Sequence, residues 1–552
     1  MSPRTQAKPP QCSPTQPPLG APVSHWWADA VLSCGPVQDY VQHLQGARLT
    51  LHYASDCTGA DAPWFAVRDL QEVLAGELGC VLEVVHEFSS EHPGRQGDAP
   101  RQWCAANCPP RVFFSDMHAR VAGGGTGPAT FSRGGTGTLP EHVHIYVGGF
   151  ECVGNTHVNR FKRAKTDSPG CADPDSSSYH TYVSSVATIQ SLRPDCWVLE
   201  NTRGCPVQAT CENLRCQLQE YVVQCLSFDA VNFYSRAHRY RNWFCGVKRA
   251  KCRLRPAEWA NFLEACSRHP SAVPPAHVWM SPVLPFEEVH MKLGGHAAPP
   301  SGGETGPKWA WVGEHTTVRE ATGRDCPLTP AQVQRLCLRG LATYREADLV
   351  TLLTAHVKAT SGDPAKLDLF WDVSAEASHN HFLDQEGSGF LQCFLSSHKQ
   401  WSARRHSVLS GAEHMWLQGC PVSANRAGLS SAKLRALAGK TMSVPSVGCV
   451  LLLGLTAVDW CGSVSPEELA ALQALSSAPS QPVVCGLRCN PARLPRSHRL
   501  PGFVIQRRPP LRCRASAESR GGARGSGRPP SGDSVPGATC AWPGGRAHLG
   551  PA

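Results

Sequence analysis

A chain of 552 residues in which 41% of the side chains are hydrophobic can form several domains and at least one large core, which excludes a small disulfide-framed domain. The formal net charge of +9 permits an anionic partner without requiring one, because so small a surplus is also common in long proteins that bind no nucleic acid. Residues 1–23 lack the basic stretch and apolar run of a secretory signal, and no later segment is a charge-poor run long enough to span a bilayer. We therefore expect an intracellular protein of the nucleus or cytoplasm, neither secreted nor bound to a membrane.

The 26 cysteines are scattered through apparent strands and helices of this large chain. This pattern predicts reduced, mostly buried thiols in place of a disulfide framework. Cys104 with Cys108, and Cys485 with Cys489, have the separations of zinc ligands, but neither has a convincing second pair nearby. We therefore expect no metal site.

The first regular elements follow residue 47. Apolar residues at 49, 51 and 53 predict a strand that runs into the small-residue turn 55–61, Ser-Asp-Cys-Thr-Gly-Ala-Asp. Apolar positions at helical spacing predict a helix from about 66 to 78, which Gly79 ends. The β-branched run at 81–85 predicts a second strand that ends at His86 and Glu87.

Strands and helices continue to alternate along the chain. Further strands are predicted at 112–114, 144–147 and 197–200, with a helix at 182–192 before the last of them. Such alternation predicts an α/β fold with a mostly parallel sheet covered by helices on both faces. In sheets of this kind a ligand binds beyond the carboxyl ends of the strands. The residues predicted at those ends are Gly59, Glu87, Asp116, Cys152 and Glu200.

Three segments show no periodicity. The Gly-rich stretches at 122–138 and 294–306 predict flexible insertions. From residue 507 onward Arg, Gly, Pro and Ser dominate with almost no large apolar side chain. We expect a disordered tail whose only activity is a weak electrostatic affinity for nucleic acid.

Five segments carry motif-like patterns in a definite order. They are 147–152 (Val-Gly-Gly-Phe-Glu-Cys), 199–202 (Leu-Glu-Asn-Thr), 237–241 (Ala-His-Arg-Tyr-Arg), 409–419 (Leu-Ser-Gly-Ala-Glu-His-Met-Trp-Leu-Gln-Gly) and 438–447 (Ala-Gly-Lys-Thr-Met-Ser-Val-Pro-Ser-Val). Together with the turn at 55–62, their order and content resemble the cytosine-5 DNA methyltransferase family from residue 47 to about 455.

The resemblance implies an α/β, Rossmann-like, S-adenosylmethionine-dependent methyltransferase fold with a smaller target-recognition domain. The expected parts are a flexible N-terminal segment at 1–45, a catalytic methyltransferase core at 46–250, a target-recognition region with insertions at 251–402, C-terminal motifs that return to the core at 403–460, and a C-terminal extension at 461–552.

The resemblance also implies a site for S-adenosylmethionine. The backbone around Gly59 would approach the methionine part of the cofactor, which a Cβ would hinder. Glu87 would accept hydrogen bonds from the ribose diol, and Asp116 would accept one from the adenine amino group. The implied cofactor residues are Asp56, Cys57, Thr58, Gly59, Glu87, Asp116, Met117, Ser443 and Val444.

Catalysis is implied for Cys152, Glu200 and Arg239. Attack of the Cys152 thiolate on carbon 6 of a flipped-out cytosine would let carbon 5 take a methyl group from the sulfonium. Glu200 would donate a proton at ring nitrogen 3, which stabilises the addition intermediate where it forms. Arg239 would contact the cytosine carbonyl, whereas Arg241 would hold the site together through acidic partners.

Six positions depart from the family pattern. Cys57 stands at a usual Phe, Asp61 at a usual Gly, Glu151 at a usual Pro, Val153 and Ala237 at usual Gln positions, and Lys440 at a usual Asn. A carboxylate beside a thiol raises the thiol pKa unless a cation offsets it. In the following loop, Arg160, Lys162, Arg163 and Lys165 offer such cations.

The leading prediction is a monomeric DNA (cytosine-5-)-methyltransferase that uses S-adenosylmethionine, with DNA as partner and RNA as an open alternative. A branch of the family methylates transfer RNA, but its Cys-Phe-Thr signature does not occur in the recognition region. The departures also leave open a relative that binds cofactor or nucleic acid without turnover. The target sequence and the choice between new and maintenance methylation depend on the divergent region, which carries no readable signal.

Overall fold

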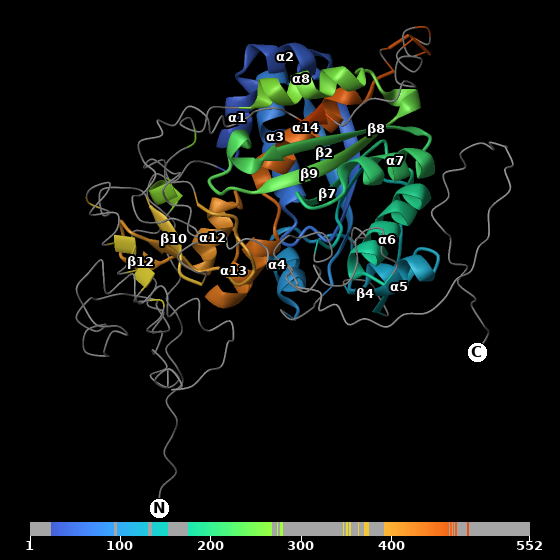
Figure 1. Ribbon diagram of the computed structural model, residues 1–552. Coiled ribbons are helices and arrows are strands. Elements are labelled where there is room, and N and C mark those ends of the chain that lie inside the picture. The colour runs from blue at the N-terminus through green and yellow to red at the C-terminus, as the bar shows by residue number, and fades with distance from the viewer. Residues whose placement is uncertain are drawn as a thin grey trace, which may run out of the picture. The chain divides into compact units, whose positions relative to one another are not determined.

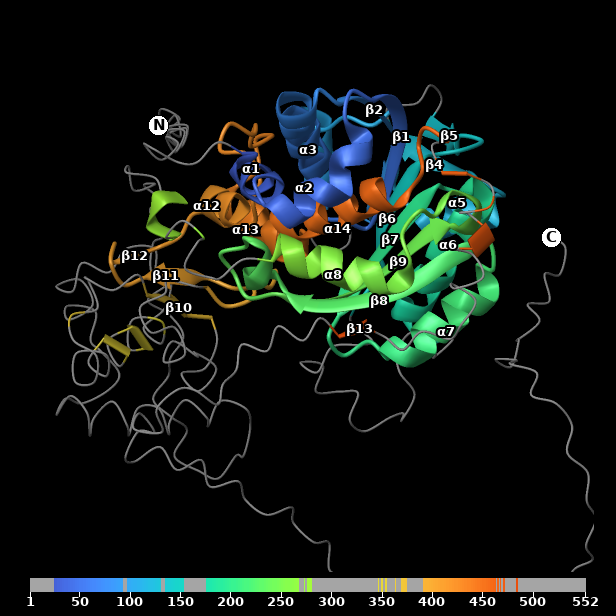
Figure 2. The same cartoon turned by 90° about the horizontal axis from the view of Figure 1, so that it is seen from above.

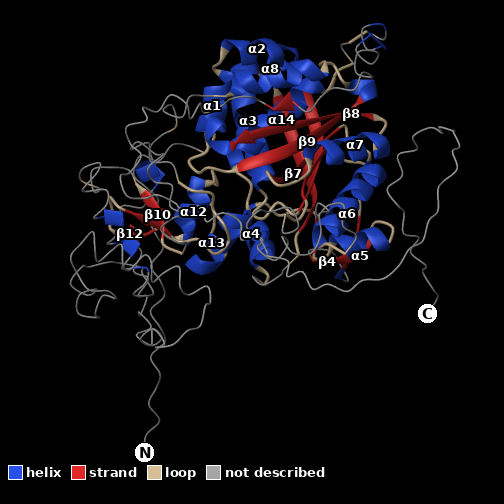
Figure 3. Ribbon diagram, viewed as in Figure 1, coloured by secondary structure: helices blue, strands red, loops and turns tan. Residues whose placement is uncertain are grey.

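The structure is a computed structural model that describes residues 24–92, 97–130, 135–152, 175–267 and 391–462, with scattered residues between 273 and 374 and between 464 and 484. Its centre is a ten-stranded sheet with the order β13-β8-β9-β7-β6-β1-β2-β3-β4-β5 (Figure 1, Figure 3). The strands are β1 (Arg48–Asp56), β2 (Val81–Ser90), β3 (Val112–Phe114), β4 (Thr126–Thr130), β5 (Thr136–Thr138), β6 (Ile145–Gly149), β7 (Cys196–Thr202), β8 (Tyr221–Asp229), β9 (Tyr240–Lys248) and β13 (Val483–Val484).

The central strands have the arrangement of Rossmann-like folds. Neighbours run parallel from β3 through β2, β1 and β6 to β7. Strand β9 is antiparallel to both β7 and β8, so the sheet is mixed where a mostly parallel one was predicted. The predicted α/β class is confirmed, and the antiparallel strand follows from the short connection between β8 and β9, which permits only a hairpin-like return.

Helices cover both faces of the sheet, as predicted (Figure 2). Alternate residues of each strand point to opposite faces, so Tyr53 and Val147 join one hydrophobic core and their neighbours Ala54 and Tyr146 join another. The first core includes residues of α1 (Trp26–Leu32), α2 (Gly35–Val41), α3 (Ala62–Leu78), α4 (Ala99–Asn107), α8 (Pro256–Cys266), α13 (Ser431–Lys440) and α14 (Val444–Ala457). The second includes residues of α6 (Ser177–Leu192) and α7 (Val207–Gln217), and α5 (Met117–Ala122) packs against α6.

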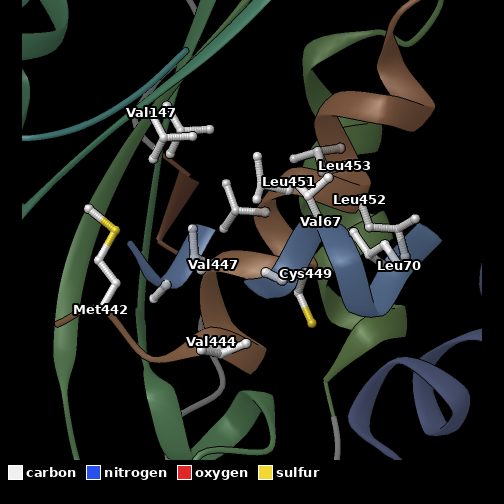
Figure 4. Packing of buried hydrophobic residues seen from close by; sticks show 14 of the residues in the cluster. Val67, Leu70, Val147, Met442, Val444, Val447, Cys449, Leu451, Leu452 and Leu453 are labelled. Atoms are coloured by element: carbon white, nitrogen blue, oxygen red, sulfur yellow. The ribbon is translucent and has the colours of Figure 1, made fainter. Parts of the chain in front are cut away.

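Helix α14 is buried along its whole length. It packs against α3, and Figure 4 shows Val447 and Leu451 in one cluster with Val67 and Val147. The stretch Ser431–Ala457 is apolar and long enough to cross a membrane, which corrects the expectation that no segment is. Because 83% of its most apolar window is buried inside the fold, its position in the core explains its composition.

The expectation of a flexible segment at 1–45 is wrong for its second half. Helices α1 and α2 and a 3-10 turn at Gln42–Leu44 occupy residues 26–44. Trp27 is fully buried, and its indole nitrogen donates to Asp69 of α3 at 2.7 Å. Burial raises the pKa of Asp69 to about 7, against the lowering effect of that hydrogen bond. Residues 1–23 lie outside the described part of the chain.

The predicted flexible insertion at 122–138 instead contains ordered strands. Strands β4 and β5 pair antiparallel and extend the sheet beyond β3. The glycines that suggested flexibility permit close packing: a Cβ at Gly127 would lie 2.8 Å from the Cα of Arg120, and one at Gly137 would lie 2.4 Å from Val112. The Gly-rich stretch at 294–306 and the predicted tail after 507 lie outside the described residues.

The end of the predicted recognition region, 251–402, and the residues just after it form a small antiparallel sheet. Its strands are β10 (Phe370–Asp372), β11 (Gln400–Ser402) and β12 (Ser407–Val408), and α12 (Gly411–Leu417) follows it. A bridge between Ala237 and Leu391 joins this part of the chain to the segment before β9. Because few residues between 268 and 390 are described, the boundaries of this region stay a prediction.

The position of Trp27 yields a first testable prediction. Its ring lies against Gly448 of α14, where a Cβ would approach it to 2.0 Å. Trp27→Ala should lower the free energy of unfolding by about 3–5 kcal/mol, the usual cost of truncating a buried tryptophan. Denaturant unfolding measures this change, with Asp39→Ala on the exposed side of α2 as the control. Equal stability of the two variants would contradict the placement of α1 in the core.

Candidate active site

The carboxyl ends of β1, β2, β3, β6 and β7 lie along one edge of the sheet, because these five strands are parallel neighbours (Figure 1). The turn after β1 occupies the middle of this edge. Three of its residues have positive φ: Cys57 at 55°, Gly59 at 75° and Asp61 at 57°. The Cys57 amide of this turn donates to the carbonyl of Ser90 at 2.7 Å, so the turn is held against the end of β2.

Gly59 is required by packing against the connection between α13 and α14. A Cβ there would lie 2.9 Å from the carbonyl carbon of Lys440 and from the amide nitrogen of Thr441. The next amide, that of Ala60, donates to the Thr441 hydroxyl at 3.1 Å. The sequence indicated that Gly59 makes room for a cofactor; the described contacts show that it makes room for residues 440–441.

Asp56, predicted to bind the cofactor, is committed to a buried ion pair. Both Asp56 and Arg120 are fully buried, and the guanidinium donates to the two carboxylate oxygens at 2.9 and 2.7 Å. The Tyr146 hydroxyl adds a third bond at 2.7 Å. Since a bidentate guanidinium and a phenol occupy the carboxylate, Asp56 is a structural residue, and the prediction for its side chain is wrong.

Asp61 also belongs to a buried hydrogen-bond network. One oxygen accepts from Tyr53 at 2.6 Å and from Thr58 at 3.3 Å. The other accepts from Ser89 at 2.7 Å and lies 3.2 Å from Nε2 of His86. Burial by itself raises the pKa of Asp61, but hydrogen bonding and charge from His86 outweigh burial, and the net direction is downward. The carboxylate that replaces a usual glycine is therefore stabilised in its ionised form.

The prediction that Glu87 ends the second strand is wrong. Strand β2 continues to Ser90, with an irregularity in its pairing to β1 at Glu87. The Glu87 carboxylate lies 2.5 Å from His52 and accepts from Arg111 at 2.9 and 3.1 Å. The acid that follows the true strand end is Glu91.

Glu91 lies where an acid for the ribose diol is expected. Its Oε2 accepts from the Gly59 amide at 3.4 Å, and its Oε1 lies 3.9 Å from Nζ of Lys440. Only 11% of its side chain is exposed. Burial raises the pKa of Glu91 to about 7, although Lys440 and the Gly59 amide oppose the rise. Glu91 carried no signal in the sequence, because the polar run Ser89-Ser90 does not indicate a continuing strand.

Asp116 and Met117 lie at the end of β3, as predicted. Asp116 caps α5, with its Oδ1 accepting from the amides of His118 and Ala119 at 2.8 and 3.1 Å. The Cys57 thiol donates to the sulfur of Met117 at 3.6 Å, so the turn after β1 and the start of α5 are in contact. The structure thus brings together the predicted residues 57–59, 116 and 117.

Ser443 and Val444 do not line an open surface. Both are buried, and Val444 belongs to the hydrophobic core (Figure 4). They begin α14, whose apolar residues must face the core, so the residues that reach the ligand edge lie earlier, at 440 and 441. The assignment of Ser443 and Val444 to the cofactor site stays a prediction.

The described residues of this edge fit S-adenosylmethionine. Glu91 offers a partly desolvated carboxylate, the kind of group that accepts from a diol. Beside it, Ser90 Oγ is buried and has no hydrogen-bond partner among the described residues. The residues that would hold the cofactor are 57–59, Ser90, Glu91, Asp116 and Met117.

Cys152, Glu200 and Arg239 lie close together near the ends of β6 and β7. Because β9 runs antiparallel beside β7, Arg241 pairs with Thr202 and Arg239 precedes the strand. Arg241 lies on β9 and Arg239 just before it, and both guanidiniums reach toward Glu200. Glu200 Oε1 lies 2.6 Å from Nε of Arg241 and 3.8 Å from Nη2 of Arg239. Arg241 thus pairs with an acid, as the resemblance implied.

The electrostatics at Cys152 combine opposing effects. Burial raises the pKa of the Cys152 thiol, the charge of Glu200 raises it further, and the two guanidiniums lower it. Glu151 raises it as well, though less than these neighbours. In the free protein the thiol is therefore mostly protonated, and it becomes more acidic when the charge of Glu200 is neutralised.

One neighbour of this site carried no sequence signal. Nη2 of Arg241 lies 4.0 Å from Sγ of Cys393, a residue of the predicted recognition region. Backbone hydrogen bonds hold this segment in place: His238 donates to Leu391 at 2.8 Å, and Leu391 donates to Arg236 at 3.0 Å. The segment at 391–393 therefore forms one wall of the site.

Two groups of described side chains have possible metal ligands within 4.8 Å of one another. They are Asp61 with Cys104 and Cys108, and His142 with His144 and Asp195. The oxygens of Asp61 accept from the four donors given above, and Lys248 and Lys251 lie 3.2 and 3.0 Å from the oxygens of Asp195. The carboxylate oxygens of Asp61 and Asp195 are already paired with donors and cations of the protein. Neither arrangement therefore favours a metal ion. Every cysteine among the described residues is free.

No family model matches the chain. It is 24% identical over 459 residues to the DNA (cytosine-5-)-methyltransferase DMT5 of Cryptococcus neoformans, which covers 79% of this chain and 18% of the relative. It is 23% identical over 493 residues to DMT5 of Verticillium dahliae, which covers 76% of this chain and 20% of the relative. The chain thus spans about a fifth of the length of the curated relatives it matches.

Solved structures with some likeness include a putative prophage DNA modification methyltransferase from E. coli, with a TM-score of 0.39 and 14% identity over 73% of this chain and 98% of that one. The S. pombe Dnmt2 methyltransferase has a TM-score of 0.34 and 10% identity over 74% of this chain and 98% of that one. The order and direction of the central strands, with helices on both faces, make the fold Rossmann-like. The more particular resemblance, to cytosine-5 DNA methyltransferases, is confirmed by the two DMT5 relatives.

The ion pair of Asp56 and Arg120 yields a second prediction. Asp56→Ala leaves a buried guanidinium without its acid, so the free energy of unfolding should fall by about 3–5 kcal/mol. Denaturant unfolding measures the loss. Asp116→Ala, which removes a partly exposed helix cap, should cost only about 1 kcal/mol. A small effect of Asp56→Ala on stability would return Asp56 to the list of ligand-binding candidates.

Proposed function

We propose that this chain transfers a methyl group from S-adenosylmethionine to carbon 5 of cytosine in DNA, through a covalent adduct with Cys152. The observation that carries the proposal is the juxtaposition of Cys152 with Glu200, Arg239 and Arg241 at strand ends that also present the residues fitted to the cofactor. A thiol coupled to an acid and two guanidiniums in a largely buried site has the groups that nucleophilic addition to a pyrimidine needs.

In this mechanism Glu200 and Cys152 act together. Protonation of Glu200 neutralises its charge and so removes one of the effects that hold the thiol neutral. The Cys152 thiolate then adds to carbon 6, while the Arg239 guanidinium binds the base carbonyl and offsets the charge that develops there. As the thiolate adds, Glu200 passes its proton to ring nitrogen 3 of the cytosine and becomes a carboxylate again. Arg241 keeps Glu200 in place. S-adenosylmethionine supplies the methyl group.

Two other functions are the alternatives to this proposal, and an observation favours one of them. Likeness to the Dnmt2 structure is too low to favour transfer RNA, and the Cys-Phe-Thr signature of that branch does not occur in the sequence. A relative without turnover is motivated by Glu151, whose charge raises the pKa of the Cys152 thiol. Duplex DNA is the proposed substrate because both curated relatives are named DNA methyltransferases.

The covalent step is tested with DNA that contains 5-fluorocytosine. Fluorine cannot leave as a proton does, so the enzyme should stay bound as an adduct that resists denaturation and forms only with cofactor present. Cys152→Ser should abolish the adduct, because a hydroxyl is far less ionised than a thiol. Glu200→Gln should slow its formation by about 10²–10⁴-fold. Gel electrophoresis after denaturation measures the adduct formed by the unaltered protein and by each of the two variants.

The same assay separates the alternatives. Cys205→Ser is the matched control, because Cys205 is a buried thiol of the second hydrophobic core. This variant should form the adduct as the unaltered protein does. An adduct that survives Cys152→Ser would move the nucleophile elsewhere. An adduct with transfer RNA alone would change the substrate, and none with either nucleic acid, despite cofactor binding, would favour the relative without turnover.

The reassignment from Glu87 to Glu91 is tested by cofactor affinity. Glu91→Gln should weaken S-adenosylmethionine binding by about 1.5–3 kcal/mol, the scale for hydrogen bonds to a charged group. Glu87→Gln, the matched control, should change the affinity little because Glu87 faces His52 and Arg111. Calorimetric titration measures both, and the reverse order of effects would restore Glu87 as the ribose acid.

A further inference from the structure

Lys440 is the residue of the cofactor edge that neither the family resemblance nor the proposed mechanism explains. It stands at a usual asparagine and ends α13, where the chain crosses the turn after β1. Its Nζ lies 3.9 Å from Oε1 of Glu91, and a third of its side chain is exposed. The contact between Gly59 and the backbone of residues 440–441 fixes the position from which this side chain extends.

Glu91 has few other sources of positive charge. Asp56 faces it from the end of β1 and Asp61 from the start of α3, and both carry negative charge. The Cys57 and Cys104 thiols, from the turn and from α4, are also coupled to it. The Gly59 amide contributes a long hydrogen bond of 3.4 Å. Among the groups of the described residues with the largest effects on Glu91, Lys440 is therefore the cation.

The other two acids of the turn do not depend on Lys440. Asp56 has Arg120 and Tyr146, and Asp61 has His86 with three hydroxyl donors. A carboxylate must be ionised to accept two hydrogen bonds from a diol, since a protonated acid has one oxygen that donates. Loss of the Lys440 ammonium group would therefore affect Glu91. It would leave Asp56 and Asp61 unchanged.

We propose that Lys440 is a positioning residue for the cofactor, which acts by holding Glu91 ionised and oriented toward the ribose diol. This inference rests on the proposed cofactor site. It assigns the lysine a role through Glu91 and not through direct contact with the cofactor. The asparagine usual at this position cannot supply the charge, so the lysine compensates for the burial of Glu91 between two other acids.

A pH series of cofactor binding tests the proposal. With the pKa of Glu91 at about 7, S-adenosylmethionine affinity should rise about tenfold per pH unit below 7 and level off above it. Lys440→Asn should move the midpoint upward by about one unit, the lower end of the effect of an opposite charge at this distance. Binding should then be about tenfold weaker at pH 6 and nearly equal at pH 9.

Calorimetry in buffers of different ionisation enthalpy supplies a second readout, because binding near pH 6 should release close to one proton. Lys440→Arg should restore the profile, and Lys433→Asn, on the exposed side of the same helix, should leave it unchanged. Glu91→Gln should flatten the rise. These variants keep the test decisive even if Lys440→Asn folds poorly.

Three outcomes would overturn the proposal. A loss by the same factor at every pH would mean that Lys440 contacts the cofactor directly. A rise that persists in Glu91→Gln would assign the titration to another group. If the unaltered protein binds the cofactor and Lys440→Asn has no effect at pH 6, only the role of Lys440 is overturned. If no cofactor binds at all, the proposed function is overturned together with it.

Discussion

Four consecutive residues, 439–442, hold the candidate site together. Gly439 accepts from Arg239 at 3.3 Å, Lys440 and Thr441 pack on Gly59, and Met442 lies beside Gly149 at the end of β6. These contacts join the C-terminal part of the chain to elements more than 190 residues earlier. The segment leads directly into α14, which is buried against α3 and the sheet and so anchors it.

The three carboxylates around the turn after β1 differ in their hydrogen-bond and ion-pair partners. Asp56 has a bidentate guanidinium, and Asp61 has His86 and three hydroxyl groups. Glu91 has one lysine at 3.9 Å and one long amide contact. A carboxylate that is buried but incompletely paired stays available to a ligand, whereas a saturated one contributes to stability. Pairing, and not position in the motif, therefore separates the structural acids from the candidate ligand.

The sequence predicted the elements whose patterns are strong and local. Residues 49–53, 81–85 and 145–147 lie in strands, and Gly79 ends α3 in the left-handed conformation. The elements that the sequence did not predict depend on long-range contacts. Polar residues 89–90 continue β2 because they pair with β1 and β3, and the glycines of β4 and β5 pack against Arg120 and Val112. The sequence predicted that Cys152, Glu200 and Arg239 lie together because their motifs keep fixed spacings, whereas Glu91 has no motif of its own.

The cofactor edge and the catalytic group are physically linked through residues 439–440. Arg239 donates to the carbonyl of Gly439, and the next residue supplies the cation beside Glu91. A displacement of this short segment would therefore change two things at once: the guanidinium that lowers the pKa of the Cys152 thiol, and the charge that opposes protonation of Glu91. The proposed mechanism uses both charges in one turnover, so under that proposal cofactor binding and thiol activation depend on one backbone position.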